Sequence, residues 1–111
     1  MSETAQPPLK ILIADDEANI RRILETRLAM QGHAVAAAKD GAEALELFRS
    51  VEPDVVVLDI QLEGGSGLQV LKAVRAADPA IAFVVFSNIA NPTYRKRYLR
   101  EGAAAFLDKS S

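Results

Sequence analysis

The chain has 111 residues, of which 25% are charged and 50% hydrophobic, with a net charge of -2 and no cysteine. This size and composition predict one globular domain, and the absence of cysteine excludes disulfides and thiolate metal sites. The slight negative charge argues against direct nucleic-acid binding, and no apolar segment approaches the roughly 18 residues of a membrane span. We therefore expect a cytoplasmic domain over residues 9–111, preceded by a flexible polar tail, residues 1–8, that cannot act as a secretory signal.

The chain begins its regular structure with a short apolar strand over residues 11–14 that stops at the acidic run Asp15-Asp16-Glu17. Apolar residues at intervals of three and four predict a helix over residues 18–31, with Asp16 as its N-cap and Gly32 just past its end. The apolar side of this helix, which we expect to be buried, consists of Ile20, Ile23, Leu24 and Leu28.

A weaker strand over residues 34–38 leads to a second helix. Asp40 and Glu43 have the spacing of a capping box, so this helix is expected to begin there and to end near Ser50. The next apolar run, residues 54–59, is apolar on both alternating faces, which is typical of a central parallel strand covered by helices on both sides.

The second half continues the alternation. A glycine-rich loop precedes a helix over residues 68–77, which must stop at Asp78-Pro79 because proline removes a donor and restricts the residue before it. A strand over residues 81–86, a helix over residues 92–101 with proline at its first position, and a last strand over residues 103–107 follow.

Four strand–helix units and a final strand predict an α/β fold. Helices of about 10 to 14 residues serve as crossovers between parallel strands, and right-handed crossovers place helices on both faces of the sheet. We therefore expect a doubly wound, five-stranded parallel sheet.

Chemically active side chains follow four of these strands. Asp15 and Asp16 come after the first strand, Asp59 ends the third, Ser87 ends the fourth and Lys109 follows the fifth. Because all the strands are expected to be parallel, their carboxyl ends share one edge of the sheet, where ligands bind in open α/β folds. Three carboxylates, a hydroxyl and an ammonium are thus expected to converge.

Three carboxylates within about 5 Å would repel one another by about 3 kcal/mol per pair at an effective dielectric constant near 20, and a cation would relieve this repulsion. Oxygen ligands without sulfur or imidazole suit Mg²⁺, which takes one or two carboxylates and shares a phosphate oxygen. An aspartate beside such an ion, with a hydroxyl and a lysine opposite, is equipped to attack phosphorus. The predicted chemistry is phosphoryl transfer onto Asp59.

Each of these residues also has a simpler explanation when it is taken alone. An Asp-Asp pair after a strand is often only a helix cap, Lys109 alone would be an ordinary surface lysine, and Ser87 a turn residue. The glycine loop over residues 64–67 lacks the Gly-Lys-Ser/Thr ending of a phosphate cradle. The combination of these residues, rather than any one of them, supports a shared site.

The motifs together resemble the receiver domain of two-component response regulators. The resemblance covers residues 9–109 and rests on Ile11-Leu-Ile-Ala-Asp-Asp-Glu, Val57-Leu-Asp-Ile, Gly67, Ser87 and Ala105-Phe-Leu-Asp-Lys109. It implies the strand order 2-1-3-4-5. It also implies that Asp59 accepts a phosphoryl group from a sensor histidine kinase or a phosphotransfer protein.

The resemblance further assigns roles within the site. Asp16 and Asp59 would bind Mg²⁺ directly, together with the backbone carbonyl of Gln61, and Asp15 would act through water. Lys109 would pair with the phosphoryl group. Two switch residues complete the set: Ser87 would shift to hydrogen-bond the phosphoryl group, and Phe106 would change rotamer.

The expected function is therefore a phosphoacceptor switch that assists its own phosphorylation and dephosphorylation, rather than an enzyme. One alternative is a degenerate receiver that only binds a partner, which the intact acids disfavour. Another is a small aspartate-nucleophile phosphotransferase, although that class usually carries two aspartates flanking one residue after the first strand. A flavin binder is disfavoured by the acidic loop after the first strand.

Two surfaces carry further expectations. The helix over residues 92–101 holds an exposed basic and aromatic patch, which consists of Tyr94, Arg95, Lys96, Arg97, Tyr98 and Arg100. With Phe106 this patch is expected to bind an output partner or a second copy, but neither nucleic acid nor membrane directly. Receivers normally have a fifth helix after the lysine, and this helix is absent from the 111 residues. We expect a sheet face near Ile11, Ile13 and Phe106 to be left uncovered, or buried by another chain.

Overall fold

The structure is a computed structural model that describes residues 7–59, 67–87 and 92–108. Most of the predicted tail therefore lies outside the described residues. The predicted alternation of strands and helices is confirmed, with boundaries that differ by one or two residues. The elements are β1 (Lys10–Ala14), α1 (Ala18–Met30), β2 (Ala34–Ala38), α2 (Gly41–Val51), β3 (Val55–Leu58), α3 (Gly67–Ala77), β4 (Ala82–Ser87), α4 (Pro92–Arg100) and β5 (Ala105–Asp108).

The strands form one five-stranded sheet in the order β2-β1-β3-β4-β5. Every neighbouring pair is parallel. The register places Leu12 beside Val56, and Val56 beside Phe83, across the three central strands. Both the predicted fold class and the strand order are confirmed. The reversal of strand order between β1 and β3 puts the expected ligand crevice at their carboxyl ends.

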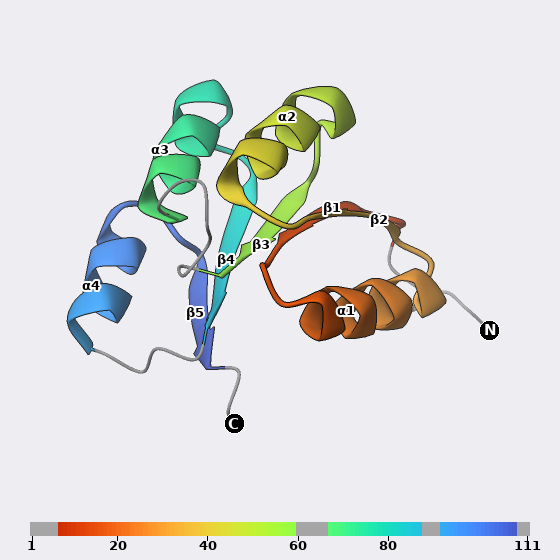
Figure 1. The fold of residues 1–111 in the computed structure, drawn as a ribbon. Coiled ribbons are helices and arrows are strands. Elements are labelled where there is room, and N and C mark those ends of the chain that lie inside the picture. Colours follow the sequence, from red (N-terminus) through yellow and green to blue (C-terminus); the bar gives the residue numbers. More distant parts are fainter. Residues whose placement is uncertain (1–6, 60–66, 88–91, 109–111) are drawn as a thin grey trace.

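Helices α2, α3 and α4 cover one face of the sheet, and α1 lies on the other (Figure 1). We call the face under α2, α3 and α4 the closed face, because its sheet residues are buried beneath these three helices. Inward-facing residues of β1, β3 and β4 pack there against one side of α2 and α3. The largest fully buried members are Leu12, Val56, Leu58, Val70, Leu71, Val74, Phe83 and Val85.

The opposite face, which we call the open face, is only partly covered. In the described part of the chain α1 is the one helix on it, and its main contacts are with β1 and β2. No residue of α1 is fully buried, and Ile23 is 49% exposed, so the expectation of a buried apolar side was wrong. Helix α1 is therefore held on the sheet by side chains that are only half-buried.

The predicted position of the uncovered surface also needs correction. Ile11 and Ile13 are buried, and Phe106 is buried on the closed face with the main core. Ile11 and Ile13 share the open face with their register partners Val55 and Val57, but they lie on β1, which α1 contacts. The uncovered surface is therefore formed by residues of the same face on β3, β4 and β5. They are the partly exposed Val55, Val57, Val84 and Phe86, together with Leu107, which is 51% exposed.

The helix starts divide into one correct and one wrong prediction. Asp40 caps α2 by accepting a hydrogen bond from the Glu43 backbone N–H at 2.8 Å, as expected. The N-cap of α1 is Glu17 rather than Asp16, and its side chain makes no capping bond. The reason is that Asp15 Oδ1 accepts the Glu17 N–H at 2.9 Å, which organises the turn and leaves Asp16 exposed at the sheet edge.

Candidate phosphoacceptor and metal site

The acidic site is built from residues that directly follow two adjacent strands. Asp15 follows β1, and its N–H donates to the Ala38 carbonyl at 3.1 Å. Asp59 follows β3, and its N–H donates to the Ala14 carbonyl at 2.9 Å. These bonds continue the parallel ladder one residue past the strands. The backbone therefore fixes the two aspartates side by side at the carboxyl edge of the sheet.

Four carboxylates meet at this edge. Asp15, Asp16, Glu17 and Asp59 each offer an oxygen, and these oxygens all lie within 4.8 Å of one another. Asp15 and Asp59 are 2% and 3% exposed, whereas Asp16 and Glu17 are exposed. The prediction that the three aspartates converge is confirmed. Glu17 was not expected among them, although its position directly after the two aspartates was a signal for it.

This donor set fits a divalent ion such as Mg²⁺. Negative charges separated by about 5 Å repel one another by about 3 kcal/mol per pair at an effective dielectric constant of 20, so a cation between them is favoured. All the donors are hard oxygens, which suit Mg²⁺, and the two exposed carboxylates leave one side open to water and a phosphate oxygen. Gln61, the expected backbone ligand, lies outside the described residues.

Ser87 lies on the neighbouring strand at the same edge. It is the last residue of β4, is fully buried, and stands beside Asp108 of β5 in the sheet register. Lys109 follows Asp108 in the sequence and lies outside the described residues. The structure thus brings the three predicted aspartates together and puts the serine at the end of the next strand, while the roles of these residues stay predictions.

Phe106 is buried next to α4. Its ring meets that of Tyr98 edge to face, with centroids 6.3 Å apart, and Arg95 Nη1 donates to its backbone carbonyl at 3.4 Å. Tyr98 is the one buried residue of α4, so its assignment to the exposed patch was wrong. Tyr98 lies among charged residues of α4, and an aromatic residue in such a helix could have been predicted to face the core.

Tyr98 also connects α4 with the site. Burial raises the pKa of its hydroxyl to about 12, a hydrogen bond with the Leu68 backbone opposes this change, and the charge of Asp59 adds to it. Leu68 belongs to the first turn of α3, the helix that comes after β3 in the chain. The switch candidate Phe106 therefore packs on a side chain whose hydroxyl bonds to the first turn of α3.

The fold and the clustered aspartates agree with the relationship found by comparison. The chain matches a family model described as response regulator receiver domain over residues 11–111. The chain belongs to this family. The functional assignment of this receiver domain therefore depends on the carboxylates at the edge of its sheet.

Relatives support the same assignment. The chain is 42% identical over 100 residues to a protein of Guillardia theta named "Probable transcriptional regulator ycf27", covering 90% of this chain and 39% of that protein. It is 34% identical over 102 residues to the response regulator MprA of Mycolicibacterium vanbaalenii, covering 92% and 44%. The receiver domain thus spans less than half the length of these relatives.

Solved structures have the same fold. The chemotaxis response regulator CheY4 of Vibrio cholerae superposes with a TM-score of 0.87 at 26% identity, covering 95% of this chain and 89% of that one. The non-phosphorylated HemR receiver domain of Leptospira biflexa gives a TM-score of 0.87 at 30% identity, covering 95% and 84%. Separately, none of the helices in the described ranges is long and apolar enough to cross a membrane.

Proposed function

We propose that this receiver domain is a phosphorylation switch whose acceptor is Asp59. The observation that carries the proposal is the position of Asp59: it is buried at the end of the central strand β3, with three other carboxylates converging on it. The donor would be the phosphohistidine of a sensor histidine kinase or a phosphotransfer protein. A cytoplasmic location, which such donors require, stays a prediction.

The proposed transfer is an in-line displacement. A carboxylate oxygen of Asp59 forms the new P–O bond while the P–N bond to the donor imidazole breaks, and the imidazole departs with the electron pair and is protonated by solvent. A bound Mg²⁺ would neutralise charge on the phosphoryl oxygens. Asp16 and Asp59 would hold the ion directly, with the Gln61 carbonyl, and Asp15 would hold its water ligands. Lys109 and Ser87 would contact the phosphoryl group.

Two other functions have less support. A degenerate receiver that only binds a partner has no need to keep four carboxylate oxygens within 4.8 Å, because their repulsion costs stability. An aspartate-nucleophile phosphotransferase would carry two aspartates flanking one residue after the first strand, whereas Asp15 and Asp16 are adjacent after β1. The phosphoacceptor role accounts for both features.

The experiment is incubation with Mg²⁺ and acetyl phosphate, followed by intact mass. The wild type is expected to gain one phosphoryl group that hydroxylamine removes, because an acyl phosphate is formed. Asp59→Asn should gain none. Asp16→Ala should be phosphorylated at least about tenfold more slowly and bind Mg²⁺ more weakly, because a metal carboxylate is lost.

Matched controls separate site chemistry from charge. Asp54→Asn removes a carboxylate at the opposite end of β3, where Asp54 Oδ2 accepts the Lys10 N–H at 2.9 Å, and should leave phosphorylation unchanged. If Asp59→Asn still gained a hydroxylamine-labile phosphate at the wild-type rate, the assignment of the acceptor would be wrong. Equal Mg²⁺ affinities for wild type and Asp16→Ala would contradict the proposed metal ligands.

We further propose that the exposed side of α4 and β5 carries the output signal. The supporting observations are the burial of Phe106 under α4, the Arg95 bond to the Phe106 carbonyl, and a dense positive charge. This basic surface consists of Arg95, Lys96, Arg97 and Arg100, with the exposed Tyr94. Phosphorylation that moved Ser87 or Phe106 would shift the helix that displays these charges.

Charge reversal tests this surface. Lys96→Glu with Arg100→Glu should weaken partner binding or self-association of the phosphorylated chain by about tenfold, with phosphorylation unchanged, because neither residue contacts the acidic site. Arg22→Glu with Arg27→Glu, on the exposed side of α1, makes the same change in net charge elsewhere. Sedimentation velocity is the measurement. Equal weakening by both pairs, or unaltered association in both, would contradict the assignment.

A further inference from the structure

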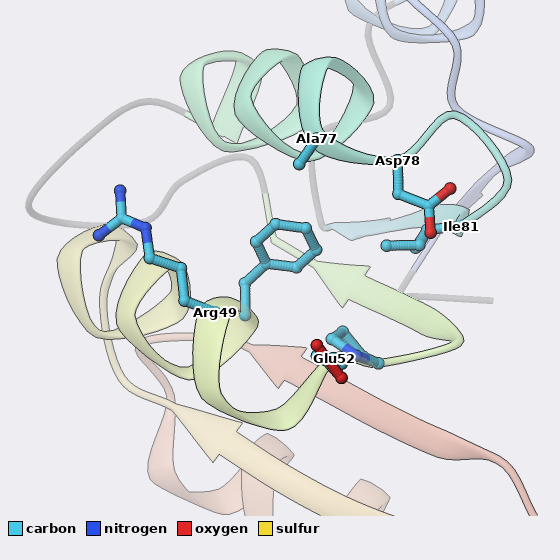
Figure 2. A pocket seen from close by; sticks show the side chains of 7 residues that line it. Arg49, Glu52, Ala77, Asp78 and Ile81 are labelled. Atoms are coloured by element: carbon cyan, nitrogen blue, oxygen red, sulfur yellow. The ribbon is translucent and has the colours of Figure 1, made fainter.

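A second candidate site lies at the amino edge of the sheet, at the opposite ends of the strands from the carboxylates. It is a pocket of about 520 Å³ between the ends of α2 and α3 (Figure 2). This volume is within the range of known ligand sites, about 300–1,000 Å³. Its lining residues are Phe48, Arg49, Glu52, Pro53, Ala77, Asp78 and Ile81. None of them belongs to the phosphoacceptor site.

The pocket is electronegative because two helices end at it. Helix α2 ends at Val51 and α3 at Ala77, and the last carbonyls of a helix carry a partial negative charge. A carboxylate directly follows each helix, from Glu52 and from Asp78. Within the described ranges the one ion pair is Arg97–Glu101, so neither of these carboxylates is paired with a cation there. The wall of the pocket therefore favours a positive ligand.

Two arginines lie near the pocket without cancelling this charge. The Arg49 side chain extends away from the carboxylates of Glu52 and Asp78 (Figure 2). Arg75, in the last turn of α3, donates to the carbonyls of Pro79, Ile81 and Gly102, and it does not line the pocket. Neither carboxylate of the pocket wall is therefore neutralised by these two arginines.

The backbone at Glu52 is a separate sign that this carboxylate matters. Glu52 has φ 53° and ψ 63° and is the one non-glycine residue with positive φ in the described chain. Its N–H closes the helix on the Phe48 carbonyl. Glycine is the usual residue at such a position because it has no Cβ penalty. With glutamate in place of glycine, this helix end carries a carboxylate that lines the pocket.

The apolar part of the pocket narrows the choice of cation. The Phe48 ring lines it, and Pro53 and Ile81, both buried, lie at the starts of β3 and β4. An aromatic ring attracts a cation placed over its face, and a guanidinium stacks better on it than an ammonium does. A planar guanidinium can also donate two bonds at once to a carboxylate. A bare metal ion would use neither the ring nor the apolar floor.

We propose that this pocket binds an arginine side chain presented by a partner protein. The guanidinium lies over Phe48 and donates to Glu52 and Asp78, and its aliphatic stem packs on Pro53 and Ile81. This interaction is independent of the phosphoacceptor role, because the pocket and the acidic edge share no residue. It gives the domain a docking point that stays available in both phosphorylation states.

The test is titration of the unphosphorylated 111-residue chain with N-acetyl-arginine amide, followed by amide NMR. Saturable shifts are expected at Phe48, Glu52 and Asp78. N-acetyl-citrulline amide, which is similar in shape but neutral, should bind at least about fivefold more weakly because the cation is lost. N-acetyl-lysine amide should also bind more weakly, because its ammonium neither stacks nor forms a two-pronged bond.

Variants with opposite expected signs make the test sharp. Glu52→Gln with Asp78→Asn should weaken arginine binding at least about fivefold, and the asparagine keeps an acceptor for the Ala80 N–H, which Asp78 Oδ1 now holds at 2.9 Å. Arg49→Gln removes a positive charge and should leave binding equal or tighter. Asp59→Asn should bind as the wild type does.

Three outcomes would overturn the proposal. They are the absence of saturable shifts at the pocket residues, equal binding of the citrulline derivative, and unchanged binding in a folded double-carboxylate variant. Each can be obtained while phosphorylation of Asp59 is fully normal, and the reverse also holds. Arginine binding at the pocket and phosphorylation of Asp59 are thus tested independently.

Discussion

The two faces of the sheet are built from the same kinds of residue and are buried to very different extents. In β3, Val56 is fully buried on the closed face, and its neighbours Val55 and Val57 are partly exposed on the open face. In β4, Val85 is fully buried and Val84 is not. A run of valines therefore indicates that both faces of a strand favour burial, but it does not show whether a helix packs on each face.

This difference matters for the site, because side chains packed on a face of the sheet hold the strand ends in place. The closed face connects the strand end before Asp59 to α4 through Leu58, Val85, Phe106 and Tyr98, which are neighbours in that order and are all buried. Among the described residues the open face offers no such connection, since α1 is half-buried over β1 and β2. Signal transmission is expected through the closed face, and stability can be gained on the open one.

The largest effect should come from closing the open face. An amphipathic helix added after residue 111, long enough to lie across β3, β4 and β5, would bury about four apolar side chains against Val57, Val84 and their neighbours. At about 1.5–3 kcal/mol each, the free energy of unfolding should rise by about 6–12 kcal/mol. Urea unfolding measures this change, and sedimentation should show self-association of the 111-residue chain that the added helix suppresses.

The control is the same helix with serine at its apolar positions, which adds equal length without apolar cover. It should leave both stability and association as they are in the 111-residue chain. A stable, two-state monomer of 111 residues, no more stable when the apolar helix is added, would show that the open face needs no cover.

A smaller effect should separate the two faces within one strand. Val56→Ala leaves a cavity in the closed core and should lower the free energy of unfolding by about 2–3 kcal/mol, whereas Val57→Ala, on the partly exposed face, should lower it by about 1 kcal/mol. The two residues are adjacent and identical, so strand propensity cancels. Urea unfolding of both variants is the measurement, and equal losses would remove the distinction between the faces.

The sequence predicted the elements and the convergence of three aspartates, because these follow from period, turns and parallel topology. The strand order came from the resemblance to receiver domains, since periodicity alone does not fix which strands are neighbours. It placed the cap of α1 on Asp16, since propensity cannot show that Asp15 already holds the Glu17 N–H. It assigned Phe106 to the uncovered surface and Tyr98 to the exposed patch, but these side chains pack on each other. Errors of this kind concern which side of an element is covered, and only tertiary contacts decide that.

The smallest predicted effect uses Tyr98, whose hydroxyl is held on the closed face. Its pKa is raised by burial to about 12 from 10.0. The folded chain therefore keeps this proton at a pH where the unfolded chain releases it. The stabilisation is complete below pH 10 and is lost as the pH rises through 12. By pH 11 the loss should reach about 1.4 kcal/mol.

Tyr98→Phe keeps the edge-to-face contact with Phe106 but cannot ionise, so it should be less stable than wild type at pH 8 by about 1 kcal/mol, for the lost hydrogen bond with Leu68. The difference in unfolding free energy between wild type and variant should then shift by about 1.4 kcal/mol in favour of the variant between pH 8 and pH 11. Tyr94→Phe, on the exposed side of α4, is the matched control and should show no such shift. If the difference in unfolding free energy between wild type and Tyr98→Phe stayed constant over this range, the Tyr98 hydroxyl would be in contact with water. Helix α4 would then not bury the closed face at this position.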